Sequence, residues 1–101
     1  MIEYNGENYE SLIEKGLIAI QYYATWCGPC KMLGPILESI SEERKDLTFY
    51  RIDIDKYRAQ ATEVGIRSVP TIVLYRDGKE VDRVSGYQPK EKVLQWLDQN
   101  K

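Results

Sequence analysis

The only two cysteines of the chain, Cys27 and Cys30, are separated by two residues. Side chains at this spacing can approach closely enough to switch between a dithiol and a disulfide. An apolar run at 17–24 precedes the pair and a helical pattern follows it, so a strand is expected to pass into a helix here. The partial positive charge of a helix N-terminus favours a thiolate over a thiol. We therefore predict that Cys27 is a redox nucleophile and Cys30 its resolving partner.

Other uses of such a pair fit the sequence less well. Half of a zinc site has this spacing, but zinc requires four ligands, and the chain has no histidine and no third cysteine. A structural disulfide across two residues closes a very small loop and removes little entropy from the unfolded chain. Trp26 before the pair, Gly28 and Pro29 within it and Lys31 after it favour redox chemistry, and we predict no metal site.

The composition is that of one globular domain spanning 1–101. The chain has 101 residues, of which 43% are hydrophobic and 30% charged, and its net charge is -2. Because 14 basic and 16 acidic residues are interspersed, we find no basic patch for nucleic acid. The longest apolar run, 17–24, is too short to span a membrane.

The first residues, 1–5, contain no basic segment followed by an apolar run, so no signal peptide is visible. We expect a cytoplasmic protein, although a processed chain would also lack its signal. In the reducing cytosol, a C-x-x-C pair is more often catalytic than structural.

Periodicity and turn signals predict the element order β-α-β-α-β-α-β-β-α. β-α-β crossovers join parallel strands, whereas a turn at Asp77 and Gly78 joins an antiparallel hairpin. We therefore expect an α/β fold, a central mixed sheet of about five strands flanked by four helices. Strands are predicted at 2–4, 17–24, 47–54, 71–75 and 80–84, and helices at 8–15, 30–44, 56–64 (or an irregular turn there) and from Pro89 onward.

Two of these elements carry further expectations. The strand 17–24 is apolar almost throughout, so we expect it to be central and buried on both faces, with polar Gln21 in its middle. Pro35 lies within the helix 30–44 and is expected to kink it. The buried side of this helix is predicted to comprise Met32, Leu33, Ile36, Leu37 and Ile40.

A second informative stretch is Gly-Ile-Arg-Ser-Val-Pro-Thr at 65–71. A proline directly before a buried strand cannot donate to the ladder, and by itself it indicates only the start of a strand. Together with Trp-Cys-Gly-Pro-Cys-Lys at 26–31, this stretch resembles the thioredoxin family, and the resemblance covers essentially the whole chain. It implies the thioredoxin fold, a cis Val69–Pro70 bond beside the two cysteines, and a Val69 backbone free to bind an extended substrate.

The resemblance also implies the activity of a protein disulfide reductase that serves electron transport and cell redox homeostasis. Cys27 would attack the disulfide of a protein substrate, and Cys30 would resolve the mixed disulfide. A reductase of the thioredoxin-reductase type would restore the dithiol, no cofactor beyond the Cys27–Cys30 disulfide is implied, and we expect a monomer. The substrate surface would comprise Trp26, Gly28, Pro29, Val69, Pro70, Thr71 and Gly86, with Lys31 in a supporting role.

The sequence departs from the family pattern at Gln21, where thioredoxins usually bury an aspartate. An amide cannot exchange a proton at neutral pH. We hypothesise that Cys30 loses its proton to water, to Cys27 or to the substrate leaving group, and that turnover is slower. The plain alternative is that Gln21 is a satisfied polar group of the core.

Arg51 stands where the family often has a lysine, and it can point outward, pair with Asp53 or bond to Gln21. We predict a Gln21–Arg51 contact.

Two further positions near the motif lead to structural predictions. Asp55 aligns with an acid that in relatives accepts a hydrogen bond from the Trp indole, so we predict an Asp55–Trp26 contact; the plain alternative is a solvated surface carboxylate. Tyr23 stands where many relatives carry a second Trp. We expect it to pack beneath the motif and to find a partner for its hydroxyl.

Two other functions remain compatible with this fold. An oxidant or isomerase would act in an oxidising compartment, but oxidant relatives usually carry histidine between the cysteines, and this chain has none. A non-catalytic interaction module would use the fold as a binding platform. The intact cysteine pair argues against such a module, whereas Gln21 keeps it open.

Overall fold

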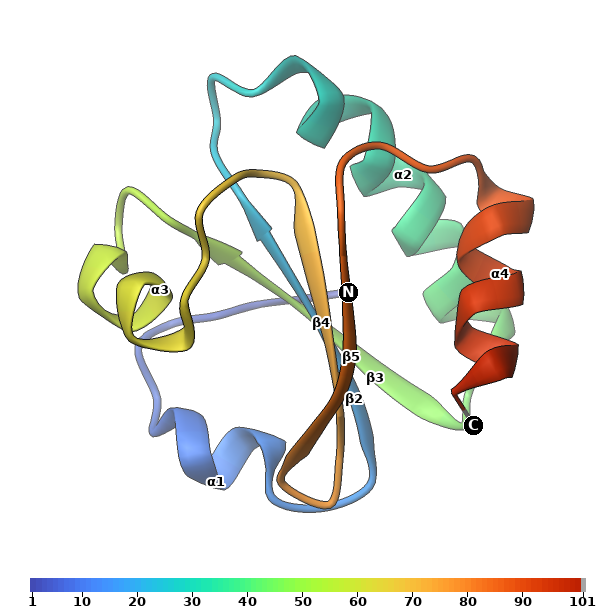
Figure 1. Cartoon of the computed structure of the whole chain (residues 1–101), viewed down its shortest axis with the longest axis horizontal. Coiled ribbons are helices and arrows are strands. Elements are labelled where there is room, and N and C mark those ends of the chain that lie inside the picture. Colours follow the sequence, from blue (N-terminus) through green and yellow to red (C-terminus); the bar gives the residue numbers. More distant parts are fainter. Residues whose placement is uncertain (101) are drawn as a thin grey trace.

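The computed structural model describes residues 1–100. Its elements follow the predicted order, and their ends differ from the predicted ones by at most two residues (Figure 1). The strands are β1 (Ile2–Glu3), β2 (Leu17–Tyr23), β3 (Leu47–Asp53), β4 (Thr71–Arg76) and β5 (Lys79–Ser85). The helices are α1 (Tyr9–Ile13), α2 (Gly28–Glu43), α3 (Arg58–Val64) and α4 (Lys90–Gln99).

The five strands form one mixed sheet in the order β1-β3-β2-β4-β5. β1, β3 and β2 run parallel, and β4 pairs antiparallel with both β2 and β5. β2 is the middle strand and is buried at every residue except Leu17. Asp77 and Gly78 join β4 to β5 with φ values of 48° and 87°, the left-handed conformation that a two-residue hairpin turn requires. The expected mixed α/β sheet is therefore confirmed.

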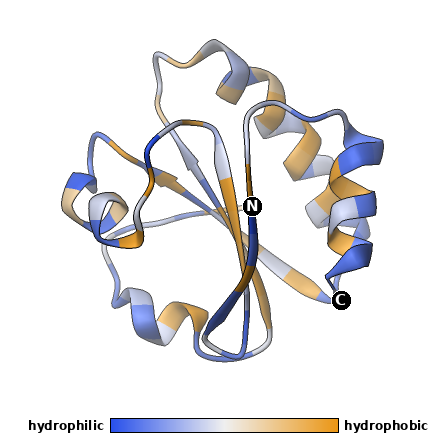
Figure 2. Cartoon of the chain, viewed as in Figure 1, coloured by the Kyte–Doolittle hydropathy of each residue, from blue (hydrophilic) through white to orange (hydrophobic). Residues whose placement is uncertain are grey.

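Alternation of side chains along the strands divides the core into two layers. In one layer Ala19 packs with Leu37 of α2 and Leu97 of α4, and in the other Ile20 packs with Ala61 of α3. Figure 1 shows α2 and α4 together on one side of the sheet and α1 and α3 on the other. The helices carry hydrophobic bands between hydrophilic ones, as amphipathic helices covering a sheet do (Figure 2).

Helix α2 begins two residues earlier than predicted because Cys27 itself caps it. The Cys27 backbone is extended, and its sulfur accepts a hydrogen bond from the Cys30 N–H at 3.2 Å. Pro29 occupies the first turn, where the N–H that proline lacks would have no helical partner. The start of the helix is thus set by the motif that carries the cysteines.

Two details of the helices differ from the sequence prediction. Met32, predicted to be buried, is 59% exposed, because it lies about 100° around the helix from the fully buried Leu33. Helix α1 ends at Ile13, two residues before the predicted end. Pro35 lies inside α2, and the helix continues through it to Glu43.

The two edges of the sheet differ from its centre. β1 contains only two residues, both exposed. β5 is exposed over most of its length and carries charges at Lys79, Glu80, Asp82 and Arg83. Short edge strands and charged edge side chains both discourage pairing with a second sheet.

Candidate active site

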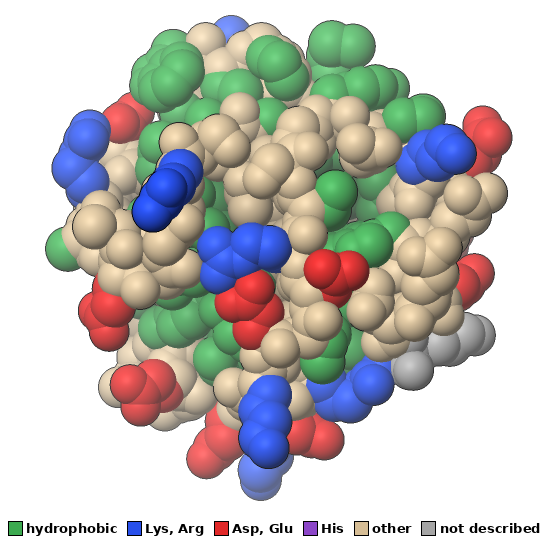
Figure 3. Space-filling view, viewed as in Figure 1, with side chains coloured by type: hydrophobic (Ala, Val, Ile, Leu, Met, Phe, Trp, Pro, Cys, Tyr) green, Lys and Arg blue, Asp and Glu red, His purple; other side chains and the backbone are tan. Residues whose placement is uncertain are grey.

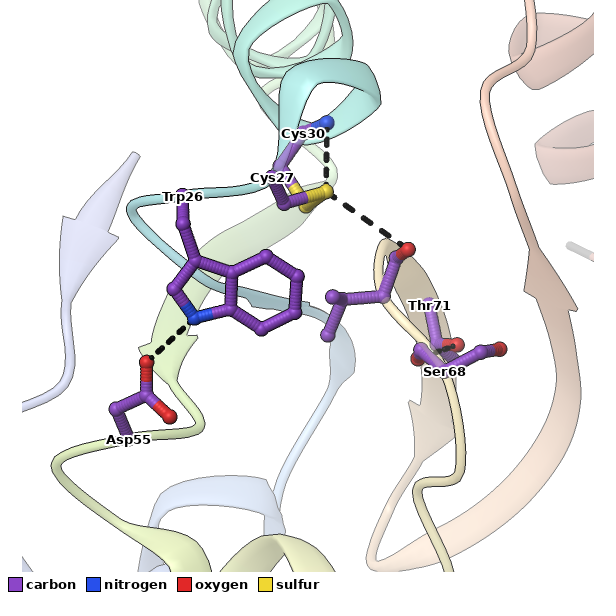
Figure 4. Close-up of a disulfide and its surroundings, with 7 residues drawn as sticks. Trp26, Cys27, Cys30, Asp55, Ser68 and Thr71 are labelled. Atoms are coloured by element: carbon purple, nitrogen blue, oxygen red, sulfur yellow. Dashed lines mark hydrogen bonds between the residues drawn. A yellow bond between two sulfur atoms is a disulfide. The ribbon is translucent and has the colours of Figure 1, made fainter.

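The two cysteines form a disulfide at the N-terminus of α2 (Figure 4). β2 ends at Tyr23, and a turn held by the hydrogen bond from the Cys27 N–H to the Ala24 carbonyl (3.2 Å) leads into the helix. Cys27 is 5% exposed and Cys30 is 4% exposed. The chain therefore places a redox-active pair at the point where strand and helix meet, as the sequence predicted.

The Val69–Pro70 peptide bond is cis and lies against this pair, which confirms the prediction. The Val69 carbonyl oxygen is 3.8 Å from the Cys27 sulfur. Val69 also packs against the small cluster formed by Tyr23, Ala24 and the two cysteines. The loop before β4 and the start of α2 thus form one site, although more than thirty-five residues separate them in sequence.

The predicted Trp26–Asp55 contact is present. The indole N–H of Trp26 donates to Asp55 Oδ2 at 2.9 Å (Figure 4). The other carboxylate oxygen of Asp55 pairs with Arg58 at 3.1 Å. Trp26 nevertheless remains 68% exposed. The hydrogen bond therefore fixes an exposed apolar ring beside the disulfide.

Tyr23 packs beneath the motif as expected, and its hydroxyl has a partner. It belongs to the buried cluster around the two cysteines, and its O–H donates to Glu3 Oε2 at 2.6 Å. Burial, followed by this hydrogen bond, raises the pKa of Tyr23 to about 12. The Tyr23 hydroxyl therefore stays protonated at neutral and mildly alkaline pH.

The predicted Gln21–Arg51 hydrogen bond is absent, and this prediction is wrong. The two residues do face one another in the β2–β3 ladder, but the Arg51 guanidinium pairs with Glu3 (Nε to Oε1, 3.3 Å) and lies 3.9 Å over the Tyr23 ring. Asp53, the alternative partner of Arg51, instead accepts the N–H of Asp55 at 2.9 Å.

The reason for this difference lies in β1, where Glu3 is directly opposite Arg51 in the ladder. A carboxylate attracts a guanidinium more strongly than a neutral amide does. Gln21 is 1% exposed, and within residues 1–100 its Oε1 has no hydrogen-bond partner. Glu3 is a residue near the site that sequence reasoning missed. Its only signal was the predicted edge strand at 2–4, which does not reveal its register.

The remaining predicted surface residues come from the start of α2, the end of the loop before β4 and the loop after β5. Gly28 and Pro29 are exposed at the start of α2, with exposed Lys31 after the second cysteine. The Gly86 N–H donates to the Pro70 carbonyl at 2.8 Å, which brings the loop after β5 to the cis proline. Thr71 is buried, and its hydroxyl donates to the Ser68 carbonyl at 2.7 Å, so its side chain is held within the loop before β4.

Pockets lie on both sides of the disulfide. One of about 360 Å³ separates Trp26 from α3 and the loop 66–69. On the other side, Cys30, Lys31 and Arg51 line pockets of about 240 and 470 Å³. Water therefore reaches the neighbourhood of Cys30 from the side that carries these two cations.

Two further findings concern residues 1–100 alone. No group of three or more His, Cys, Asp or Glu side chains there is placed to hold a metal ion. None of the helices in this range is both long enough and apolar enough to span a membrane.

The chain resembles known proteins over nearly its full length. The family model described as Thioredoxin matches residues 1–99. The chain is 43% identical to the thioredoxin of Chlamydia caviae over 96 residues, which cover 95% of this chain and 94% of that protein. It is 34% identical to the thioredoxin of Staphylococcus aureus over 103 residues, covering 99% and 97%.

Solved structures give the same result. The N21Q mutant thioredoxin from Halobacterium salinarum NRC-1 matches with a TM-score of 0.88 and 32% identity, over 98% of this chain and 88% of that one. The thioredoxin NaTrxh from Nicotiana alata matches with a TM-score of 0.89 and 32% identity, over 99% and 91%.

Proposed function

Because the chain belongs to the thioredoxin family and is a protein disulfide reductase, we propose that Cys27 is its nucleophile and Cys30 its resolving thiol. The observation that carries this assignment is the cap of α2. The Cys27 sulfur accepts the Cys30 N–H, so in the reduced protein a thiolate there meets an N–H donor and the positive end of the helix. Cys30 does not occupy the N-cap position that would stabilise a thiolate in this way, because it lies within the helix.

The reaction transfers two electrons to the substrate. The Cys27 thiolate attacks one sulfur of a substrate disulfide, that bond breaks, and the departing substrate thiolate takes up a proton. Cys30 then loses its proton, and its thiolate attacks the Cys27 sulfur of the mixed disulfide. The second substrate thiol leaves, and the Cys27–Cys30 disulfide is formed.

The substrate surface is formed by the loops around the disulfide. An extended substrate segment pairs with the Val69 backbone, which adjoins the Cys27 sulfur. The exposed Trp26 ring offers apolar contact area beside it. Gly28, Pro29, Pro70, the Thr71 backbone and Gly86 complete this surface, with Lys31 in support.

The cycle is completed by a partner enzyme of the thioredoxin-reductase type, which returns two electrons to the Cys27–Cys30 disulfide. The protein then serves electron transport and redox homeostasis in the cytoplasm as a single-domain monomer. Its partners are disulfide-containing proteins, not nucleic acid, and it needs no further cofactor.

The test is reduction of insulin disulfides with dithiothreitol as the electron source. The protein should accelerate the reaction, and Cys30→Ser should abolish this acceleration. Incubated with insulin without dithiothreitol, reduced Cys30→Ser should accumulate a mixed disulfide at Cys27 that mass spectrometry detects. Equal inactivity of both proteins would instead identify a non-catalytic interaction module. A reduction potential near that of the strongly oxidising members, roughly -120 mV, would identify an oxidant.

A further inference from the structure

The pocket of about 360 Å³ beside Trp26 borders the substrate surface described above on its α3 side and shares Trp26 and Val69 with it. We call it the α3 pocket. Its apolar lining consists of Trp26, Ile54, Ala61, Ile66 and Val69. Val69 belongs both to this lining and to the surroundings of the cysteines. A substrate segment lying along Val69 therefore has the α3 pocket within reach of its side chains.

The rim of the α3 pocket is positively charged. Arg58 and Arg67 both line it, and both are exposed. Arg58 pairs with Asp55 at 3.1 Å, so its charge is largely offset. Arg67 forms no ion pair or hydrogen bond within residues 1–100 and leaves one positive charge without a counterpart. Figure 3 shows Lys and Arg side chains on the α3 side of this face of the molecule.

We propose that the α3 pocket selects substrates that carry an acidic side chain, preferably glutamate, close to the cysteine under attack. The proposal rests on the reductase function assigned above. The methylene groups of glutamate would lie against Ile66 and Val69, and its carboxylate would meet the Arg67 guanidinium. Arginine binds carboxylates through two parallel N–H donors, which adds geometric selectivity to the charge.

The distance from the cysteines limits where the acidic residue lies in a substrate. An extended chain advances about 3.3 Å per residue, and alternate side chains point the same way. Because Val69 adjoins both the Cys27 sulfur and the α3 pocket, the selected position is within about three residues of the substrate cysteine.

Synthetic disulfide peptides test this inference. Each peptide carries Glu, Gln or Lys at one of the positions flanking its cysteine, and the second-order rate of mixed-disulfide formation with Cys30→Ser is measured at low ionic strength. At one or two positions the Glu peptide should react about three- to tenfold faster than its Gln counterpart, and the Lys peptide more slowly. Added salt should reduce the difference.

Two substitutions assign the effect to the α3 pocket. Arg67→Gln should remove the preference for glutamate, and Arg58→Gln should weaken it by leaving Asp55 unpaired at the rim. Lys79→Gln removes the same charge from the exposed hairpin end of β5 and should keep the preference intact. All three side chains are exposed, so the variants are expected to fold.

The outcomes separate this inference from the reductase function. Equal rates for Glu and Gln peptides at every position would show that the α3 pocket does not select acidic substrates. Equal effects of Arg67→Gln and Lys79→Gln would show the same. Neither result would contradict the reductase function. Failure of every peptide to form a mixed disulfide would overturn the assignment of Cys27 as well.

Discussion

Gln21 presents a buried amide oxygen that has no hydrogen-bond partner within residues 1–100, although Arg51 stands directly opposite it in the ladder. An unpaired polar atom in a dry interior costs free energy, on the order of 1–3 kcal/mol. Gln21 therefore contributes less to the stability of the folded protein than an amide whose hydrogen bonds are all formed. It lies in the central strand, five residues before Trp26, the first residue of the redox motif.

Replacing the amide by a carboxyl changes stability in a pH-dependent way. Burial raises the folded-state pKa of such a carboxyl above its unfolded value of about 3.9. Relative to wild type, Gln21→Asp should therefore lose stability as pH rises above about 4, by roughly 1.4 kcal/mol for each unit of that shift. Urea unfolding at pH 4 and pH 7.5 measures this, with Gln21→Asn as the isosteric neutral control. The same loss at both pH values would refute the argument.

The same substitution tests how Cys30 loses its proton. The family resemblance implies that a carboxylate at position 21 can accept that proton, which an amide cannot. Gln21→Asp should therefore speed resolution of the mixed disulfide at neutral pH by about tenfold, whereas Gln21→Asn should not. Single-turnover kinetics between pH 6 and 9 give this rate. An unchanged rate would mean that water in the pockets beside Cys30 suffices.

At the scale of elements, the C-terminus of α3 is held by a residue from β5. The Arg83 guanidinium donates to the carbonyls of Val64 (3.0 Å) and Gly65 (3.4 Å) and to both carboxylate oxygens of Glu80 (2.7 and 2.6 Å). The last carbonyls of a helix otherwise lack donors. This clamp ties α3, and with it one wall of the α3 pocket, to the edge of the sheet.

Removing the Arg83 clamp should destabilise the protein. Arg83→Gln is expected to cost about 1–2 kcal/mol, because two helix-end carbonyls lose their donor. Arg83→Lys should restore less than half of this, since an ammonium group cannot reach three partners in a planar fork. Arg58→Gln, at a mostly exposed ion pair, is the control and should cost less than about 0.5 kcal/mol. Equal losses in urea unfolding for Arg83→Gln and Arg58→Gln would contradict the clamp.

The sequence predicts those elements whose determinants lie within a few neighbouring residues. The β2 run, the cap and stop signals and the Asp77-Gly78 turn act over a few residues, so the element order was correct. The cis Val69–Pro70 bond was available only through resemblance to a family. The partner of Arg51 was not predictable, because it depends on the register of a two-residue strand. Met32 was misplaced because it lies beside the buried stripe of α2.

Across the whole molecule, hydrogen-bonded tyrosine hydroxyls of half-buried Tyr9 and buried Tyr22 and Tyr75 link α1, β2 and β4. Tyr22 donates to Tyr9 (3.1 Å) and Tyr9 to Tyr75 (2.7 Å). Burial is the main cause that raises the pKa of all three, to about 12 for Tyr22. Because the unfolded state ionises first, near pH 10, unfolding releases protons above that pH.

Stability should therefore be fully present below pH 10 and fall between about pH 10 and 12. Each fully responding tyrosine contributes a slope of roughly 1.4 kcal/mol per pH unit. Urea unfolding of the disulfide form from pH 8 to 11.5 measures the fall, and absorbance at 295 nm follows tyrosinate. Tyr22→Phe should reduce the slope of the unfolding free energy against pH by the contribution of one tyrosine, up to roughly 1.4 kcal/mol per pH unit. Constant stability up to pH 11.5 would show that these tyrosines ionise alike in both states.

The charged and truncated edges of the sheet also bear on how the molecule meets other chains. An unpaired sheet edge offers backbone hydrogen bonds to any extended chain that it meets. Here β1 offers two residues, and β5 presents Lys79, Glu80, Asp82 and Arg83. These two edges thus discourage backbone pairing, whereas the Val69 carbonyl, where we propose that substrate binds, lies 3.8 Å from the Cys27 sulfur. If substrate binds at Val69 as proposed, backbone pairing takes place in the loop before β4, beside the reactive cysteine, and not at the edges through which sheets aggregate.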